Sequence, residues 1–488
     1  MAKAMRQGDV IDMCVEYFPS FLRSRQEAQK LEAWRTGRQY EYSEDLNEDD
    51  RAFGQPFSPD KAAHSAEFEN LRGLSSNMFA GLISTTIASL ANMEGISKGN
   101  SGVKLSTWET FERNRWGSKQ NAIHESATAH GVSYGIVIPG KDPLTGNKMS
   151  KMMGRSAIRM AGFYDNDDDE WSIFTIEAEP NQVKDPETGF IADGWSVRVF
   201  DAYVIHNLTC TSNGTERKEW KYLDHSTHGV PVPPVARLAN RMDLDGNAVG
   251  EIEPVLPLLR RIDQGTFDRL IKQRFGAWQV RYIAGMAKPS KEDEENAQAM
   301  KLSMQDLLVS TSHETRFGVL PADPLDGQIS VTDADLRILS AVAQIPPHHL
   351  LGLSSNLQAE ALAAANEGLQ RRGHAFRTNA AEFHEQMARL AAMMEGDMIT
   401  AAAWDLQVQW RDVESRSLSQ TADALTKLAE GLHIPVEMLW EKLPGWTDND
   451  STRAKQLIES GALNQILEQL AIEAGNNNPN PEPAGDTE

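Results

Sequence analysis

Hydrophobic positions at the start of the chain recur at helical intervals. Val15, Phe18, Leu22 and Leu31 are separated by roughly the three- and four-residue steps of one helix face, which predicts a helical N-terminal part. The acidic run at residues 44–51 is typical of a solvated connection. The chain is therefore expected to begin with helices joined by polar segments.

Another helix is expected to start at Asp60. Residues 77–93 (NMFAGLISTTIASLANM) are weakly polar, but the stretch is shorter than the about 20 residues that a membrane span needs and it contains several hydroxyl side chains. It therefore predicts a buried helix rather than a transmembrane one.

From Tyr134 the pattern changes to short runs typical of strands: GIVIP, WSIFTIEAE, GWSVRVFDAYVIHN and KEWKYLDH. Turn-forming stretches (DPLTG, DPETG, SNGT) separate these runs. Prolines 231, 233 and 234 exclude a helix and favour an extended edge segment near the end of this region. Residues 134–245 are thus predicted to form a β-rich module.

Helical spacing returns at residues 251–282, with Pro254 in the first turn of a long helix. A polar helix at residues 291–307 and two short strand-like pieces are expected next. A second helix is predicted for residues 330–343, with Thr332 as its cap and Asp335 three residues further on.

Ile345, Pro346 and Pro347 end that helix, and HHLLGLSSN is predicted to form a loop. A very long helix follows at residues 357–394, in which Gly368 and Gly373 would permit a bend. Helices are further expected at residues 418–432, 436–443 and 451–474, and residues 475–488 have the composition of a disordered tail.

Composition narrows the class of protein. A hydrophobic core usually stops growing at about 250 to 300 residues, so a chain of 488 residues is expected to contain several packing units. The N-terminus lacks the apolar region of a secretion signal, which predicts synthesis in a cytoplasm. Cys14 and Cys210 are far apart and predict ordinary thiols. The formal net charge of −22 opposes tight binding of nucleic acid but suits a protein along which nucleic acid slides.

Two glycine motifs resemble catalytic or phosphate-binding loops. Residues 95–99 (GISKG) match the spelling of a nucleophile elbow, but a helix is expected before them, so a helix-ending turn is predicted. Residues 140–148 (GKDPLTGNK) lack the spacing and the closing GK[ST] of a phosphate loop and predict a hairpin turn.

Candidate metal ligands are equally incomplete. Asp243, Asp245 and Asn247 imitate a calcium loop, but Ala248 and Pro254 replace its Gly and Glu, which leaves at most a surface cation site. The acidic run Asp165, Asp167, Asp168, Asp169 and Glu170 favours a solvated loop over a two-metal site.

The histidines also give no metal site. His348 and His349 are adjacent and expected to point in different directions, and His374 and His384 lie ten residues apart on a helix, where structural or surface roles are expected. No nucleophile, base and orienting group are assembled. We therefore predict no enzyme, cofactor or metal centre.

Three stretches resemble the portal proteins of tailed bacteriophages, in the family related to the portal of the Bacillus phage SPP1. Residues 229–271 resemble the segment in which a proline-rich strand leads into the first stem helix. Residues 345–352 (IPPHHLLG) resemble the family's I/V-P-P-H-x-L-G pattern with one additional residue. Residues 353–372 (LSSNLQAEALAAANEGLQRR) resemble the start of its long kinked helix. The three occur in the family's order.

The resemblance implies an α+β, predominantly helical portal fold with wing, stem, clip and crown. It places a wing at residues 1–250, stem helices at 251–278 and 330–344 and a clip between them at 279–329. It also implies a tunnel loop at 345–356, a long kinked wing helix at 357–396, a helical crown at 397–474 and the tail at 475–488.

By the same resemblance, the tunnel loop would face DNA. The residues of this DNA-facing loop would be Pro346, Pro347, His348, His349, Leu350, Ser354, Ser355 and Asn356. Leucines of the loop could equally pack against a neighbouring helix. The first stem helix carries a basic face of Arg260, Arg261, Arg269, Lys272 and Arg274. That face either approaches DNA or pairs with acidic neighbours such as Asp263 and Asp268.

The function implied is a head–tail connector of the virion: a homododecamer at one capsid vertex through which double-stranded DNA is packaged and ejected. Its implied partners are the large terminase subunit, a head–tail adaptor, the major capsid protein and the scaffold protein, with no membrane and with assembly in the host cytoplasm. The alternatives are another virion structural protein, such as a minor capsid or tail-interface protein, and a metal-dependent hydrolase that uses the acidic run.

Overall fold

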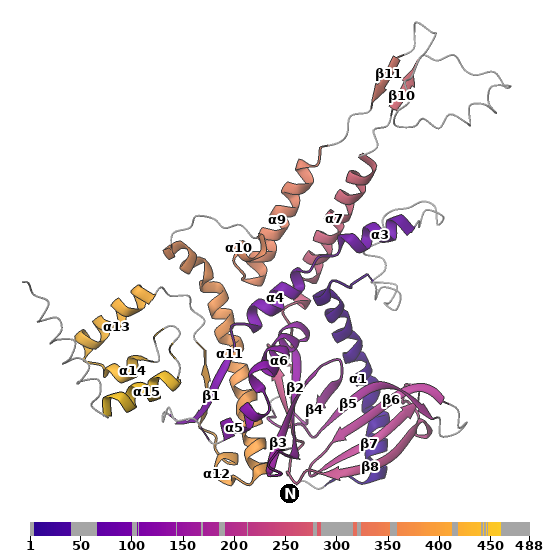
Figure 1. The fold of residues 1–488 in the computed structure, drawn as a ribbon. Helices are drawn as coiled ribbons and strands as arrows, with labels where there is room; N and C mark the ends of the chain where they lie inside the picture. The colour runs from indigo at the N-terminus through magenta and orange to yellow at the C-terminus, as the bar shows by residue number, and fades with distance from the viewer. Residues whose placement is uncertain are drawn as a thin grey trace, which may run out of the picture. The chain divides into compact units, whose positions relative to one another are not determined.

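The structure is a computed structural model with mixed helices and strands (Figure 1). It describes residues 4–40, 66–99, 105, 107–142, 144–166, 169–184, 191–211, 213–276, 281–284, 316–319, 324–351, 359–411, 418–440, 443, 446 and 448–459. The chain divides into two compact units, Met1–Arg411 and Asp412–Glu488. No described helix is long and apolar enough to cross a bilayer.

The larger unit begins with a helix laid on a sheet. Helix α1 (Gln7–Thr36) buries one apolar face and ends at Gly37, whose φ of 72° is the left-handed conformation that favours glycine at a helix end. The five antiparallel strands beneath it are β4 (Met160–Phe163), β5 (Phe174–Lys184), β6 (Ile191–Phe200), β7 (Val204–Thr211) and β8 (Trp220–Thr227), in that order. A 3₁₀ turn, Arg217–Glu219, precedes β8.

Alternation along these strands separates two kinds of face. Ile176, Val197 and Leu208 point toward α1 and pack with Phe18 and other apolar residues in one core. The opposite face carries buried Glu177, which pairs with Arg155 and with Arg198. Buried Phe200 and Ile205 form a small separate apolar cluster with Ile136 of β2 (Val132–Lys141). One face of the sheet therefore forms the core with α1, and the other packs toward the three-stranded sheet through ion pairs and this cluster.

A second core surrounds a three-stranded sheet of order β3–β2–β9: β3 (Lys148–Ser156), β2 (Val132–Lys141) and β9 (Val235–Ala239). Helices α4 (Phe79–Ala88), α5 (Thr107–Arg113), α6 (Trp116–His130) and α11 (Ala359–Glu395) pack around it. Gly135 of β2 permits a close crossing, because a Cβ there would lie 2.6 Å from Met387 Sδ and 2.8 Å from the Phe383 ring of α11. The edge strand predicted after the prolines is confirmed as β9.

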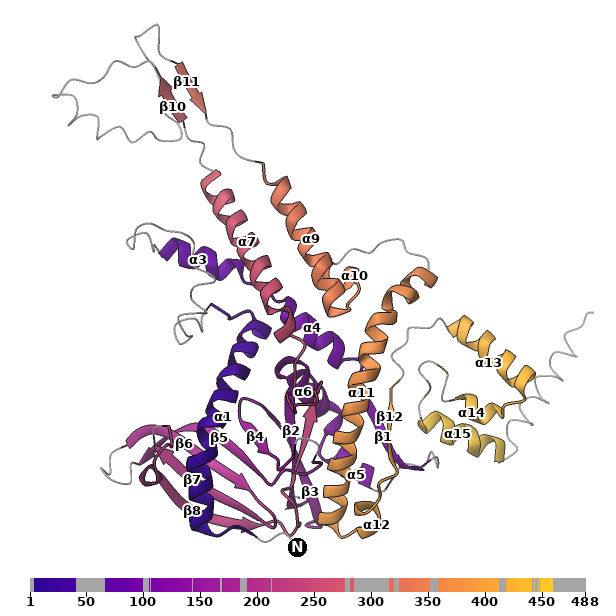
Figure 2. The ribbon, with the colours of Figure 1, turned by 180° about the vertical axis from the view of Figure 1, so that it is seen from behind.

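Two helices run side by side away from these cores (Figure 2). They are α7 (Leu256–Gly276), preceded by the 3₁₀ turn Glu253–Val255, and α9 (Asp326–Ala343). Between them in the chain lie strands β10 (Arg281–Ala284) and β11 (Arg316–Val319), which pair antiparallel. Helix α3 (Ala66–Ser75) packs against α7.

The remaining elements close the larger unit and form the smaller one. Strand β1 (Met93–Lys98) pairs with β12 (Leu406–Trp410), which follows the short helix α12 (Met398–Ala401). The smaller unit contains α13 (Leu418–Leu432), α14 (Val436–Leu439) and α15 (Asp448–Glu459). The larger unit ends at Arg411 and therefore includes α12 and β12. The helical crown was predicted to start earlier, at residue 397.

Several predictions of local structure are corrected. GISKG is not a helix-ending turn: helix α4 ends at Ala88 and most of the motif lies in β1, because pairing with β12 satisfies its backbone. Strands β3 and β4 were not predicted. The long helix ends at Gly276, so Tyr282 belongs to β10 rather than to a helix reaching residue 282.

The predicted cap is also wrong. Helix α9 starts at Asp326, so Thr332 lies inside it and its hydroxyl donates to the Gln328 carbonyl. Gly373, predicted to permit a bend in the long helix, has a packing role in α11. A Cβ at this position would lie 2.6 Å from Leu90 Cδ1, so only glycine leaves room for the Leu90 side chain. Predictions for residues 44–51, Asp60, 291–307 and 475–488 lie outside the described residues.

Candidate functional site: the α7–α9 pair and its proline turn

The base of α7 is built into the second core. Pro254 lies in the 3₁₀ turn that leads directly into α7, and not in the first turn of α7 itself; at the start of that turn a missing N–H costs nothing. Val255, Leu259 and Ile262 are buried there together with Leu336 and Leu339 of α9. The two helices thus share one apolar seam near their base.

Asp263 anchors α7 to the segments before it. Its buried carboxylate accepts hydrogen bonds from Gln39 Nε2 (2.8 Å), Tyr40 Oη (3.0 Å) and Asn77 N (3.0 Å), and from Asn77 Nδ2. Burial raises the pKa of Asp263 to about 6, and the bonds from Gln39, Asn77 and Tyr40 oppose that rise. Donors from the end of α1 and the residues before α4 therefore converge on one carboxylate of the helix.

Arg261 joins α7 to α9. Its Nη2 donates to Asp335 Oδ1 at 2.6 Å and its Nε to Asp335 Oδ2 at 3.2 Å, the two-pronged geometry in which guanidinium and carboxylate match best. Asp335 is therefore a partner of Arg261, not part of a helix cap. Within the predicted basic face, Arg261 thus links α7 to α9.

The other four cations lie in varied surroundings. Arg260 and Arg269 are half-buried, whereas Lys272 and Arg274 are exposed. Arg260, Lys272 and Arg274 each interact with another group. The structure brings these residues onto one helix, and an approach to DNA stays a prediction for them.

The turn after α9 is tightly fixed. Gln344 ends the helix with a φ of 55°, a left-handed value unusual for a residue other than glycine. The Ser340 hydroxyl donates to the Ile345 carbonyl at 2.5 Å, and Ile345 and Pro346 are buried. The proline pair therefore stops the helix, as the sequence predicted.

The first part of the predicted loop is a short helix, α10 (Pro347–Leu351). The rings of His348 and His349 do not point apart: their centroids are 4.4 Å apart with planes tilted by 35°. Burial and the neighbouring His348 lower the pKa of His349. Leu350 is buried in the second core, which confirms the packing alternative for that leucine. Ser354, Ser355 and Asn356 lie outside the described residues.

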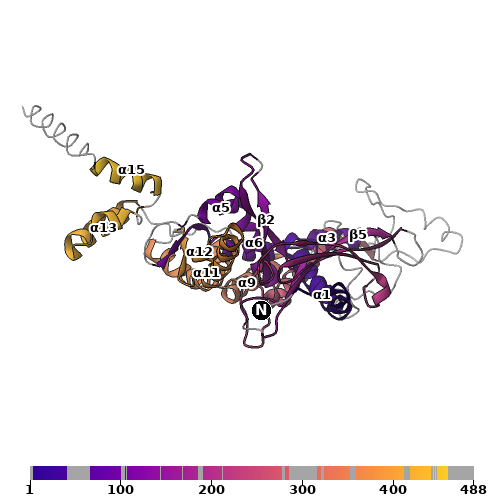
Figure 3. The ribbon, with the colours of Figure 1, turned by 90° about the horizontal axis from the view of Figure 1, so that it is seen from below.

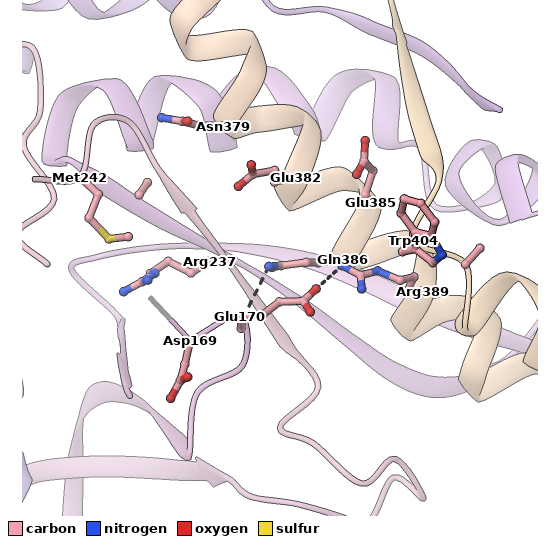
Figure 4. A pocket seen from close by; sticks show the side chains of 12 residues that line it. Asp169, Glu170, Arg237, Met242, Asn379, Glu382, Glu385, Gln386, Arg389 and Trp404 are labelled. Carbon is pink, nitrogen blue, oxygen red and sulfur yellow. Dashed lines mark hydrogen bonds and ion pairs between the residues drawn. The ribbon is translucent and has the colours of Figure 1, made fainter. Parts of the chain in front are cut away.

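The acidic run contributes to a pocket of about 470 Å³ at the β9 side of α11 (Figure 4). Four carboxylates line it: Asp169, Glu170, Glu382 and Glu385. Arg389 pairs with Glu170, as Figure 4 shows. Asp165 is exposed, and Asp167 and Asp168 lie outside the described residues.

Charge is unevenly balanced in this pocket. Burial raises the pKa of Glu385 to about 7 and the Glu382 carboxylate adds to the rise, while Arg389 opposes it. Among the described residues, no group of three or more His, Cys, Asp or Glu side chains is arranged to hold a metal ion.

The calcium-like segment forms a turn instead. Asp243 accepts hydrogen bonds from the backbone N–H groups of Asp245 and Asn247 and from Asn247 Nδ2. These bonds, led by the Asn247 side chain, lower the pKa of Asp243. Its oxygens are thus used to close the connection between β9 and α7.

Comparison with known proteins decides the family. A model of the phage portal protein family, described as SPP1 Gp6-like, matches residues 22–475. This chain belongs to that family. Membership in the portal family implies a ring-forming oligomer located in the virion. The matched residues include parts of both compact units and nearly all of the described residues.

Other comparisons add less about this portal-family chain. No curated protein matches the sequence. One similar solved structure is a chain of "Neck of empty GTA particle computed with C6 symmetry", with 9% identity and a TM-score of 0.42, covering 78% of this chain and 94% of that one.

Sequence reasoning missed the residues that anchor the base of α7. Gln39, Tyr40 and Asn77 were not expected to meet Asp263, since they lie far from it in the chain. One signal was present: Asp263 lies four residues after Leu259 and four before Phe267, which places it on the apolar side of the predicted helix. A carboxylate at such a position needs donors from elsewhere in the fold.

Proposed function

We propose that this chain forms the portal ring at one capsid vertex and acts as the conduit for double-stranded DNA during packaging and ejection. The observation that carries the proposal is the family match over residues 22–475, which spans the α7–α9 pair and its proline turn. In this role the ring guides DNA and performs no chemistry of its own.

The net charge supports a conduit. Every phosphate that a protein neutralises adds affinity, and affinity would hold DNA in place. A formal charge of −22 on each copy, repeated around a ring, repels the DNA backbone and keeps the duplex centred. Sparse cations such as Lys272 and Arg274 would then make only transient contacts.

The parts of the portal are proposed from the elements. The wing comprises residues 1–250 and the long helix α11, and the stem comprises α7 and α9. The clip, predicted at residues 279–329, includes β10 and β11 and is ended here before α9 begins at Asp326. The tunnel loop at 345–356 includes α10. Because β12 pairs with β1, we place the crown after Arg411 instead of at residue 397.

The proposed partners follow from this assignment. Twelve subunits form the ring, the large terminase docks on it during packaging and a head–tail adaptor caps it afterwards. The major capsid and scaffold proteins contact it while the head assembles in the host cytoplasm.

Negative-stain images of the purified protein test the proposal. Rings with a central hole wide enough for duplex DNA are expected. A stable monomer at all protein and salt concentrations would contradict it, and a metal-dependent hydrolytic activity lost in Asp167→Ala would favour the hydrolase alternative instead.

A further inference from the structure

The three-stranded sheet of the larger unit has edges of opposite charge. Its order places β3 and β9 at the two outer positions. Near β3 gather five cations that we call the basic patch: Lys148 and Lys151 of β3, Lys141 of β2, Lys119 of α6 and Arg115 directly before α6. Near β9 lies the acidic pocket lined by Asp169, Glu170, Glu382 and Glu385. Figure 3 shows α5 and β2 on the same side of α11.

The basic patch is not neutralised by its own chain. Arg115, Lys141, Lys148 and Lys151 are exposed, and within the described residues none of them makes an ion pair. Lys119 Nζ donates to the Met152 carbonyl at 2.9 Å. Burial lowers the pKa of Lys119, and repulsion from Lys151 and Arg115 lowers it further. Lys119, Lys151 and Arg115 are therefore close enough for repulsion, and Lys141 lies directly opposite Lys148 in the β2–β3 pairing. Such a patch would gain from an acidic partner.

The acidic pocket has the opposite imbalance. Arg389 is engaged by Glu170, and Arg237 lies over the Tyr164 ring with its Cζ 3.9 Å from the centroid. Glu382 and Glu385 make no ion pair within the described part of the chain. Each edge of the sheet thus presents charge that the other edge would neutralise.

Two further features of the pocket suit a cationic side chain. Trp404 at the rim is 88% exposed. An indole face attracts lysine and arginine side chains. A volume of about 470 Å³ is more than one such side chain needs.

We infer that the acidic pocket of one copy of this chain receives the basic patch of a second copy. The two surfaces differ and lie at opposite edges of one sheet, so each copy can bind a neighbour at both edges. Such a head-to-tail contact, repeated with a closing rotation, generates a ring. The inference rests on the ring-forming oligomer that family membership implies, and it names the contact that would join neighbouring copies.

Nucleic acid is a poor alternative occupant of the pocket. Its carboxylates would repel phosphates, and Glu382 is exposed at the surface where a phosphate would approach. A second copy supplies the exposed cations of its own basic patch. Charge complementarity therefore favours another copy of this chain as the partner.

Charge reversal on each side tests the contact. Lys151→Glu and Glu382→Lys should each raise the protein concentration at which rings half-assemble at low salt by about tenfold or more, because like charges would face each other at every interface. Carrying both reversals in one chain should restore assembly. Mixing the two single variants should also restore it, in rings where they alternate. Mass photometry and negative stain measure the rings, and circular dichroism checks the fold.

Matched controls reverse exposed charges on the five-stranded sheet. Lys221→Glu and Asp193→Lys should leave ring assembly unchanged. If wild-type rings form and folded single variants assemble like wild type, or if neither the double variant nor the mixture recovers, the inference is wrong. If the wild-type chain itself forms no rings, the proposed function fails instead.

Discussion

His124 and His384 meet in the middle of the second core with their Nε2 atoms 3.0 Å apart. Trp116 Nε1 donates to His384 Nδ1 at 3.2 Å, so the His384 proton sits on Nε2 and faces His124. His124 then carries its proton on Nδ1 and donates to the Ala91 carbonyl at 2.9 Å. The chain of bonds is complete only when both rings are neutral, and it links α6 to α11.

This pair should make the larger unit acid-sensitive. Burial lowers the pKa of His124 to about 4, and burial with repulsion from His124 lowers that of His384. Below about pH 6.5 the unfolded chain binds protons that the folded chain excludes, so stability falls by about 1.4 kcal/mol per pH unit for each histidine, down to the folded-state pKa. Thermal unfolding between pH 7 and pH 5 measures this loss.

A variant pair isolates the effect. His384→Gln should lower stability at pH 7 but flatten its fall with acidification, since one buried titrating group is removed. His374→Gln changes an exposed histidine of the same helix and should leave the pH dependence as in wild type. An unchanged slope in His384→Gln would show that the pair does not titrate as described.

Removing the Asp263 carboxylate should loosen the base of α7. Asp263→Ala leaves the donors of Gln39, Tyr40 and Asn77 without their acceptor, and such losses cost about 1–3 kcal/mol for each buried group. We expect a clear fall in the thermal unfolding temperature. Asp268→Ala, at an exposed position of the same helix, should change it little, and equal effects of the two would contradict the anchor.

The Arg261–Asp335 pair should show strong coupling. Arg261→Met leaves the nearly buried Asp335 carboxylate without its guanidinium partner. Removing one partner of a fully buried pair costs about 3–5 kcal/mol of stability. We expect a smaller loss here because the Arg261 side chain is half-exposed and solvent screens its charge. The double variant Arg261→Met/Asp335→Leu should be less destabilised than the sum of the single variants. Denaturant unfolding of all four proteins measures the coupling, and additive effects would exclude it.

A side chain at Gly135 should destabilise the fold. In Gly135→Ala the new Cβ would press on Met387 and Phe383, and overpacking of this kind costs about 1–3 kcal/mol. Gly265→Ala, in α7 where nothing lies within 4 Å of a Cβ, should instead be neutral or stabilising by up to about 1 kcal/mol. Thermal unfolding compares them, and equal stability of the two would show that α11 does not cross β2 so closely.

The sequence alone was sufficient to predict features that depend on residues close together in the chain. Helical spacing located α7, α9 and α11, the prolines located the end of α9 and the extended edge strand, and the order of the motifs identified the phage portal family that the family match confirms. These features depend on residues close together in the chain, because helix periodicity and proline geometry act over a few residues.

Only the tertiary structure decided which distant groups meet. GISKG became a strand because β12, more than 300 residues away, supplies hydrogen-bond partners. Asp263 meets donors from the α1 end, and His124 meets His384, since burial obliges polar groups to find partners wherever the fold brings them. The sequence alone indicates which polar residues will be buried and need hydrogen-bond partners. Which groups become those partners depends on tertiary distances, and no local sequence pattern encodes these distances.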